Sequence, residues 1–123
     1  MMQGVVNRSC EAILPLVISN ESRQTQLIDA VIDTGYTGFL SLPHEIIFLL
    51  NLPWTGIDRG TLSDGSEAIF EVYAAKVIWD GEYRHIPVNA AEVDPLIGMS
   101  LLYGYELQMQ AIEGGRVQIE ALR

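Results

Sequence analysis

The pattern of apolar and polar positions along the chain is mainly that of short β-strands. Ala12–Ser19 is apolar and rich in β-branched residues, and Gln26–Asp33 continues as an alternating stretch after the turn-like segment Asn20–Ser22. Two such runs separated by a short polar segment are typical of a β-hairpin with a loop of medium length. The first part of the sequence therefore predicts two antiparallel strands.

A change of period follows the next short extended piece, Phe39–Leu42. Residues Pro43–Leu52 fit a short helix, since Pro43 suits a first helical turn and Pro53 cannot continue a helix. Glu45 suits the positive N-terminal end of such a helix. The apolar run inside this segment is wide for a surface helix, so we expect most of the helix to be buried.

The second half of the chain is divided by turn signals. The strongest lies in Ser63–Ser66, because an Asp-Gly pair favours the tight turn of a β-hairpin. A long strand is expected at Glu67–Trp79, followed by a second turn at Asp80-Gly81 and a strand at Tyr83–Val88. A loop with a short helix is expected at Pro95–Tyr103, and a closing hairpin of Tyr105–Ile112 and Arg116–Leu122 turns at Gly114-Gly115. Many short strands with one or two short helices predict a compact, barrel-like β domain.

The composition is that of one folded domain. The chain has 123 residues, of which 49% are hydrophobic and 19% are charged, so it can bury a core and is not compositionally disordered. No linker, repeat or low-complexity tract is evident, and we expect a single domain over residues 1–123. The formal net charge of −9 argues against nucleic acid as a partner and against docking on an anionic membrane surface.

Disulfide, metal and membrane chemistry find little support in the sequence. Cys10 is the only cysteine, and His44 and His85 lie far apart without a ligand pair, so we expect neither an intrachain disulfide nor a metal site. The apolar runs Ala12–Ile18 and Ile46–Leu50 are too short for a signal peptide or a membrane helix. We therefore expect a soluble, cytoplasmic protein without a cofactor.

The most informative stretch is Leu27–Leu40, in which a β-branched strand runs directly into Asp33-Thr34-Gly35. This order places a carboxylate at the end of a buried strand, in a tight turn that glycine permits and that the Thr34 hydroxyl can lock. The triplet by itself arises by chance in roughly a few per cent of chains of this length, so an ordinary turn is the alternative. The strand before it and Gly38 after it make the signal more specific.

With this context, Asp33–Phe39 resembles the catalytic loop of retropepsin-like (clan AA) aspartic proteases, Asp-Thr-Gly-x-[Ser/Thr/Ala]. Val93–Leu102 is similar to the apolar-apolar-Gly element of that family, including the short helix that follows it. The hairpin at Asp64-Gly65 falls between the two, where the family has its flap. The resemblance covers nearly the whole chain. It is strongest to small prokaryotic members with an Asp-Thr-Gly-[Phe/Tyr]-x-Gly loop, and the helix after the loop differs from the viral enzymes.

The resemblance implies a mostly β, retropepsin-like closed domain, the single-lobed acid-protease fold, with one or two short helices. It implies an aspartic endopeptidase in which two copies of Asp33 share a proton across a homodimer, Thr34 bonds across that dimer, and Gly35 supports the carboxylates. The implied partners are a second copy of the chain and a peptide or protein substrate. The expected site residues are the catalytic Asp33, Thr34 and Gly35, the substrate-binding flap residues Asp64, Gly65 and Ser66, and the loop-supporting residues Ile97 and Gly98.

Two alternatives remain open at this stage. The same fold can serve as a non-catalytic peptide-binding or dimerisation module, since a fold does not fix a function. Tyr36, Phe39 and Leu40 flank the loop, and they belong either to substrate pockets or to the core.

Asp29 lies four residues before Asp33 on the same strand face, about 13 Å away, which is too far for a shared proton. We therefore expect Asp29 to be a solvated or hairpin-edge residue.

Overall fold

Strands dominate the computed structural model, which describes residues 1–62 and 64–123. Their alternating burial is the period-2 pattern of strands with one face on a core. The ten strands in this part of the chain are β1 (Met2–Val6), β2 (Ala12–Ser19), β3 (Thr25–Ile32), β4 (Leu40–Leu42), β5 (Trp54–Thr61), β6 (Glu67–Trp79), β7 (Glu82–Ala90), β8 (Leu96–Ile97), β9 (Tyr105–Met109) and β10 (Arg116–Ala121). The two short helices are α1 (His44–Leu49) and α2 (Met99–Leu102).

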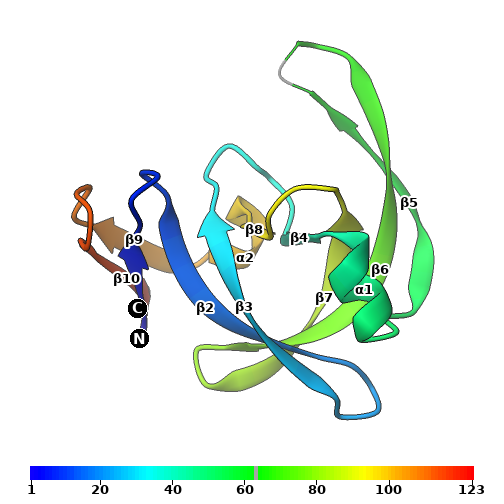
Figure 1. Cartoon of the computed structure of the whole chain (residues 1–123), viewed down its shortest axis with the longest axis horizontal. Helices are drawn as coiled ribbons and strands as arrows, with labels where there is room; N and C mark the ends of the chain where they lie inside the picture. The colour runs from blue at the N-terminus through cyan, green and yellow to red at the C-terminus, as the bar shows by residue number, and fades with distance from the viewer. Residues whose placement is uncertain (63) are drawn as a thin grey trace.

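The middle of the molecule is a closed barrel. The strands follow the order β6-β7-β4-β8-β3-β2, and β2 pairs again with β6 through Ile18↔Val77 and Ser19↔Lys76. Figure 1 shows β2 and β3 crossing β6 and β7 where the barrel closes. The inward side chains are apolar and expose no more than 2% of their surface: Leu14, Leu16, Ile18, Leu40, Leu42, Val77, Val88 and Ile97. Burial of this set is the main stabilising contribution to the barrel.

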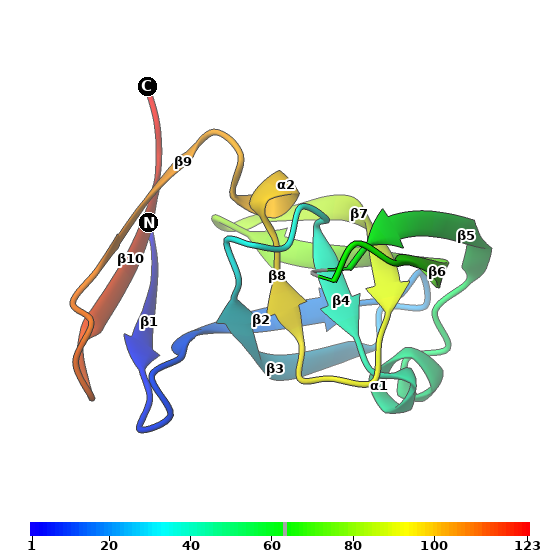
Figure 2. The ribbon, with the colours of Figure 1, turned by 90° about the horizontal axis from the view of Figure 1, so that it is seen from above.

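Two extensions leave the barrel on opposite sides (Figure 1). The β5–β6 hairpin rises from one side, and β1, β10 and β9 form a small antiparallel sheet on the other. Both chain termini lie in this second extension, which stands apart from the barrel when seen from above (Figure 2). In the described residues, no helix is long and apolar enough to cross a membrane.

The turn predicted at Asp64-Gly65 is confirmed. The N–H of Leu62 donates to the carbonyl oxygen of Ser66 at 2.7 Å, and Gly65 has a φ of +85°. This left-handed conformation is favourable for glycine. Ser63, part of the same predicted turn, lies outside the described residues.

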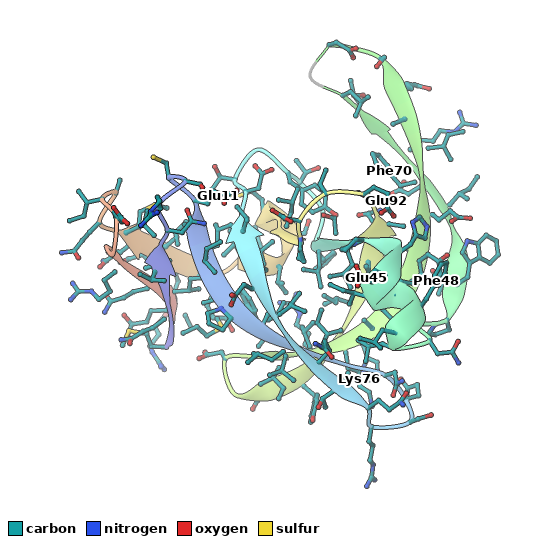
Figure 3. All side chains as sticks on the ribbon, viewed as in Figure 1. Glu11, Glu45, Phe48, Phe70, Lys76 and Glu92 are labelled. Atoms are coloured by element: carbon teal, nitrogen blue, oxygen red, sulfur yellow. The ribbon has the colours of Figure 1, made fainter. Side chains whose placement is uncertain are left out.

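The prediction that the helix after β4 is mostly buried is wrong. Within α1 only Ile47 is buried, while Phe48 and Leu49 expose 68% and 61% of their surface. Figure 3 shows Phe48 on the side of α1 away from the barrel interior. The helix ends at Leu49, so Leu50 and Leu52 reach the core from the segment after it. A helix this short presents only part of its apolar run to the core: Ile47 is buried and Ile46 packs against the core half-buried.

The pattern also missed three strands. β1 and β5 contain too many glycines and polar residues for a clear alternation, with sequences MQGVV and WTGIDRGT. β8 has only two residues, which is too short for any period. β1 pairs with the distant β10 and β8 pairs with both β3 and β4, whereas β5 pairs with β6, the next strand of the same hairpin.

Candidate active site

Asp33 is the first residue after β3, and the barrel fixes its position. Ala30 and Ile32 are buried in the core. β3 runs parallel to β8, with Ile32 opposite Ile97, and the N–H of Asp33 donates to the carbonyl oxygen of Ile97 at 2.9 Å. The carboxylate therefore leaves the sheet at a strand end whose backbone is held on both sides.

The turn after Asp33 is held by the aspartate itself. The N–H of Gly35 donates to Oδ1 of Asp33 at 2.9 Å, and the N–H of Tyr36 donates to the carbonyl oxygen of Asp33 at 3.1 Å. This is the Asx-turn arrangement, in which a short acidic side chain bonds to the backbone two residues later. The Thr34 hydroxyl is the expected lock, but Thr34 is an exposed residue within the turn. Asp33 is half-buried, and the hydrogen bond from Gly35 uses one of its two carboxylate oxygens.

The loop that follows the turn is bonded to the start of α2. Four hydrogen bonds connect the two segments: Gly98 N–H to the Phe39 carbonyl at 3.0 Å, Met99 N–H to the Tyr36 carbonyl at 2.8 Å, Ser100 N–H to the Gly38 carbonyl at 3.1 Å and Ser100 Oγ–H to the Thr37 carbonyl at 2.5 Å. They satisfy backbone groups that would otherwise be unpaired at the barrel end. The segment around Ile97 and Gly98 thus lies directly against the loop.

Gly98 allows the two segments to approach this closely. A Cβ atom at this position would lie 2.1 Å from the carbonyl oxygen of Gly38 and 2.8 Å from that of Tyr36. Both contacts are with backbone atoms, which cannot move aside as a flexible side chain can. The glycine at the end of the apolar-apolar-Gly element is therefore required by sterics at this contact.

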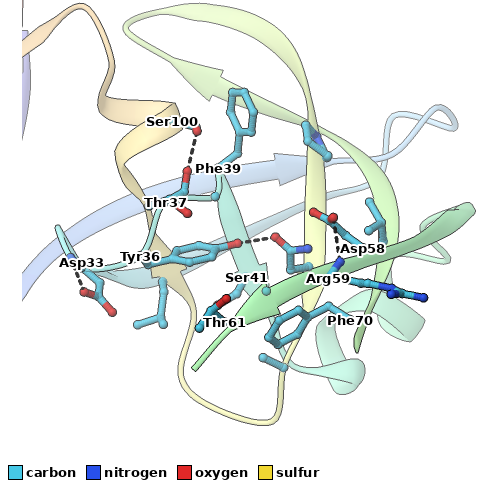
Figure 4. A pocket seen from close by; sticks show the side chains of 18 of the residues that line it. Asp33, Tyr36, Thr37, Phe39, Ser41, Asp58, Arg59, Thr61, Phe70 and Ser100 are labelled. Atoms are coloured by element: carbon cyan, nitrogen blue, oxygen red, sulfur yellow. Dashed lines mark hydrogen bonds between the residues drawn. The ribbon is translucent and has the colours of Figure 1, made fainter. Parts of the chain in front are cut away.

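A cleft of about 570 Å³ opens beside Asp33, between the loop and the β5–β6 hairpin. Figure 4 shows Asp33 at one end of it and Asp58 and Phe70 of the hairpin farther along. Tyr36 and Phe39 line this cleft, whereas Leu40 is fully buried in the core. Of the two predicted roles, Tyr36 and Phe39 therefore fit the wall of a substrate pocket, and Leu40 belongs to the core.

The predicted flap residues do not line the cleft. Oδ1 of Asp64 accepts hydrogen bonds from the backbone N–H of Ser66 at 2.9 Å and from its hydroxyl at 2.5 Å. These bonds lower the pKa of Asp64 below its usual value. The part of the β5–β6 hairpin that lines the cleft lies away from its tip and consists of residues 58–62, Phe70 and Val72.

Sequence reasoning missed a polar group in the cleft wall. The Tyr36 hydroxyl donates to Oδ1 of Asn89 at 2.5 Å. Burial, with a smaller contribution from the charge of Asp58, raises the pKa of Tyr36 to about 12. Ser41 lies opposite Asn89 on the neighbouring strand, and its buried Oγ has no hydrogen-bond partner in the described structure. Tyr36 lies in the loop after β3, Asn89 in β7 and Ser41 in β4, and no sequence signal connects them.

Solved structures that resemble the chain include two proteases. The crystal structure of a retropepsin-like aspartic protease from Rickettsia conorii matches with a TM-score of 0.63 and 17% identity, covering 99% of this chain and 91% of that one. EIAV protease complexed with the inhibitor HBY-793 matches with a TM-score of 0.57 and 14% identity, covering 75% of this chain and 85% of that one. No protein-family model and no curated protein matches. The chain therefore has the retropepsin-like fold, as its sequence predicts.

Proposed function

We propose that the chain is an aspartic endopeptidase, active as a homodimer in which each subunit contributes one Asp33. One observation carries the proposal: the Asp33 carboxylate lies at the mouth of a cleft, held in a fixed turn by the N–H of Gly35 at 2.9 Å. A carboxylate that is positioned by the backbone and still open to a ligand is suited to proton transfer.

The reaction needs a second carboxylate, and among the described residues that line the cleft only Asp33 and Asp58 carry one. Asp29 is exposed within β3, paired with Pro15 of β2. Asp58 lies across the cleft, and Figure 4 shows the ring of Tyr36 between it and Asp33. A two-fold axis through the mouth of the cleft would supply the second Asp33 from an identical subunit, as closed C2 dimers allow.

In such a dimer the two Asp33 side chains share one proton, because two like charges at close range do not both ionise. The ionised carboxylate takes a proton from a water molecule, which attacks the carbonyl carbon of the peptide. The protonated carboxylate polarises the carbonyl oxygen, and a proton then passes to the departing nitrogen. The two apparent pKa values belong to the pair, so activity depends on pH in a bell-shaped way.

The substrate is expected to bind as an extended chain. The cleft runs between the loop after Asp33 and strands of the β5–β6 hairpin, so a peptide lying in it has backbone groups of the hairpin on one side. Pairing of an extended peptide with strand backbone is a common recognition mode, and alternate side chains then enter pockets.

The test is cleavage of a diverse peptide library at several pH values by wild type, Asp33→Asn and Asp29→Asn, with the oligomeric state of each measured. Asparagine keeps the shape of the side chain and cannot share the proton. We expect loss of cleavage by Asp33→Asn only, since Asp29 is an exposed carboxylate of the same strand. If neither wild type nor Asp29→Asn cuts although both are dimers, the proposal fails in favour of a peptide-binding or dimerisation module.

Mixing subunits tests the shared site directly. Wild type and Asp33→Asn are unfolded together, refolded in equal amounts and assayed. If each site needs two Asp33 residues, only dimers of two wild-type subunits cut, and activity falls to about a quarter of that of the same total of wild-type protein. A value of about one half would show that each subunit works alone, and would overturn the two-aspartate mechanism.

A further inference from the structure

Resting on the proposed function, we propose that the cleft selects a substrate residue with a cationic side chain, lysine or arginine, and that Asp58 is the residue that selects it. Asp58 faces the cleft, forms no ion pair with a cation of the described residues, and has apolar walls around it.

Strand register directs Asp58 into the cleft. In the β5–β6 hairpin, Asp58 is paired with Phe70 and Gly56 with Val72, while Arg59 is paired with Ile69. Paired residues share a face, and successive residues alternate between faces. Phe70 and Val72 line the cleft, whereas Ile69 is 65% exposed. The carboxylate of Asp58 therefore shares the cleft face with Phe70.

The neighbouring Arg59 does not neutralise this carboxylate. Arg59 also lines the cleft, but it is paired with Ile69, and Figure 4 shows its guanidinium directed away from Tyr36. The contact between the two residues is a backbone one: the N–H of Arg59 donates to Oδ1 of Asp58 at 2.8 Å. No lysine, arginine or histidine of residues 1–62 and 64–123 forms an ion pair with Asp58.

The charge of Asp58 acts across the cleft. It contributes, after burial, to the raised pKa of Tyr36 on the opposite wall. The Asp58 carboxylate therefore contributes a negative charge to the space between these two walls. A peptide that covers this space removes water from Asp58, and a neutral or acidic side chain there leaves the carboxylate without compensation. A cationic side chain supplies the missing partner through a charge-assisted hydrogen bond.

The walls suit the long stem of such a side chain. Phe70 and Val72 from the hairpin and Leu96 from β8 provide apolar surface, and Asn89 and Tyr36 provide polar groups at the wall facing the hairpin. Lysine and arginine bury an apolar stem and keep a charged head at polar groups. The net charge of −9 also favours the approach of basic peptides at low salt.

The experiment compares peptides that differ at one position at a time, carrying Lys, Arg, Gln, norleucine or Glu. Cleavage is measured as kcat/KM for wild type, Asp58→Asn and Asp58→Lys. The control is Glu67→Gln, which removes an exposed carboxylate of the same hairpin that is not among the residues lining the cleft. Binding of the same fluorescent peptides to Asp33→Asn, with and without Asp58→Asn, is measured by anisotropy at low and high salt.

We expect one position at which wild type prefers Lys or Arg over norleucine by about tenfold, in the range that a charge-assisted hydrogen bond supplies. Asp58→Asn should abolish the preference, Asp58→Lys should shift it toward Glu, and Glu67→Gln should keep it. Because Asp58 is exposed before a peptide binds, the preference should weaken as salt is added.

The inference is overturned if no position favours a cation, or if the preference survives in Asp58→Asn. Its failure is distinguishable from that of the proposed function. Cleavage of neutral peptides without a cation preference leaves the peptidase intact and removes the role of Asp58. Absence of all cleavage overturns the peptidase, and the anisotropy comparison then decides the role of Asp58 by itself.

Discussion

The backbone N–H of Asp33 donates a 2.9 Å hydrogen bond to the carbonyl oxygen of Ile97. This bond continues the parallel pairing of β3 with β8 beyond the end of β3. The two segments that carry the family resemblance therefore meet through their backbones. The position of the Asp33 carboxylate depends on how closely β8 and the residues after it can approach the loop.

The close approach at Gly98 predicts the effect of a single methyl group. Gly98→Ala would place a Cβ atom 2.1 Å from the Gly38 carbonyl oxygen. We expect a loss of about 1–3 kcal/mol in the free energy of unfolding, as for other overpacked sites. We also expect lower kcat, because the loop carrying Asp33 must shift. Urea denaturation and peptide cleavage are the measurements. Met99→Ala, at an exposed helix position, is the control, and equal effects of the two would contradict the steric argument.

The bond from the Tyr36 hydroxyl to Asn89 predicts the effect of removing one oxygen. Tyr36→Phe should lower the free energy of unfolding by about 1 kcal/mol, because Oδ1 of Asn89 loses its donor. Tyr103→Phe, at a residue 86% exposed, should change it by less than about 0.5 kcal/mol. Equal small changes in both would show that the bond contributes nothing.

The raised pKa of Tyr36 adds a pH dependence to this prediction. Its pKa rises from 10.0 to about 12 in the folded chain. A raised folded pKa contributes stability that is complete below the unfolded value and is lost as pH rises toward the folded value. The contribution is thus present below pH 10.0 and disappears toward about pH 12. In an ultraviolet titration, the tyrosine signal absent from Tyr36→Phe should be one that ionises near pH 12.

His44 predicts a second pH dependence, because it connects three segments. Its Nδ1 contacts Glu92 after β7, and its Nε2 lies 3.5 Å from Glu71 of β6. Hydrogen bonding to Glu92, despite some desolvation, raises the pKa of His44, and hydrogen bonding to His44 lowers the pKa of Glu92. The histidine contribution is complete below its ordinary pKa of 6.5, and the glutamate contribution is complete above 4.5.

We therefore expect His44→Gln to destabilise the chain most between pH 4.5 and 6.5, and less on either side. Thermal unfolding over this pH range measures the effect, and added salt should reduce it because the groups are partly exposed. His85→Gln is the control, since His85 has one carboxylate neighbour, Glu21 at 3.4 Å, and an exposed ring. NMR titration of the His44 imidazole should give a pKa above the ordinary histidine value of 6.5. A pKa at or below 6.5 would refute the assignment.

The end of α1 offers a matched pair of neighbouring leucines. Leu50 exposes 2% of its surface and Leu49 exposes 61%. Leu50→Ala should cost about 2–5 kcal/mol of stability, because it leaves a cavity in the core. Leu49→Ala should cost less than about 0.5 kcal/mol. Chemical denaturation of both variants measures the difference. Similar losses in the free energy of unfolding would contradict the placement of Leu50 in the core and of Leu49 at the surface.

Much of the architecture could be predicted from local chemistry. The bounds of β2 and β6 agree with the expected Ala12–Ser19 and Glu67–Trp79, because buried strands alternate and β-branched residues favour them. The turn at Asp80-Gly81 lies where the sequence predicts it, with positive φ at both residues. Less could be predicted of the site: the position of Asp33 at a strand end was foreseen, but the roles of Tyr36, Asn89 and Asp58 in one cleft were not.

The sequence by itself determined most of the strands, the positions of the hairpin turns and the strand-to-turn form of the segment around Asp33. These depend on neighbours a few residues away, on glycine at positive φ and on the two-residue period of strands. Only the tertiary structure decided which segments meet, because closure of the barrel through β2 and β6 brings distant strands into register. That closure pairs the two-residue β8 with both β3 and β4, and it puts Asn89 beside Tyr36. No local period encodes such contacts, since they depend on the path of the whole chain.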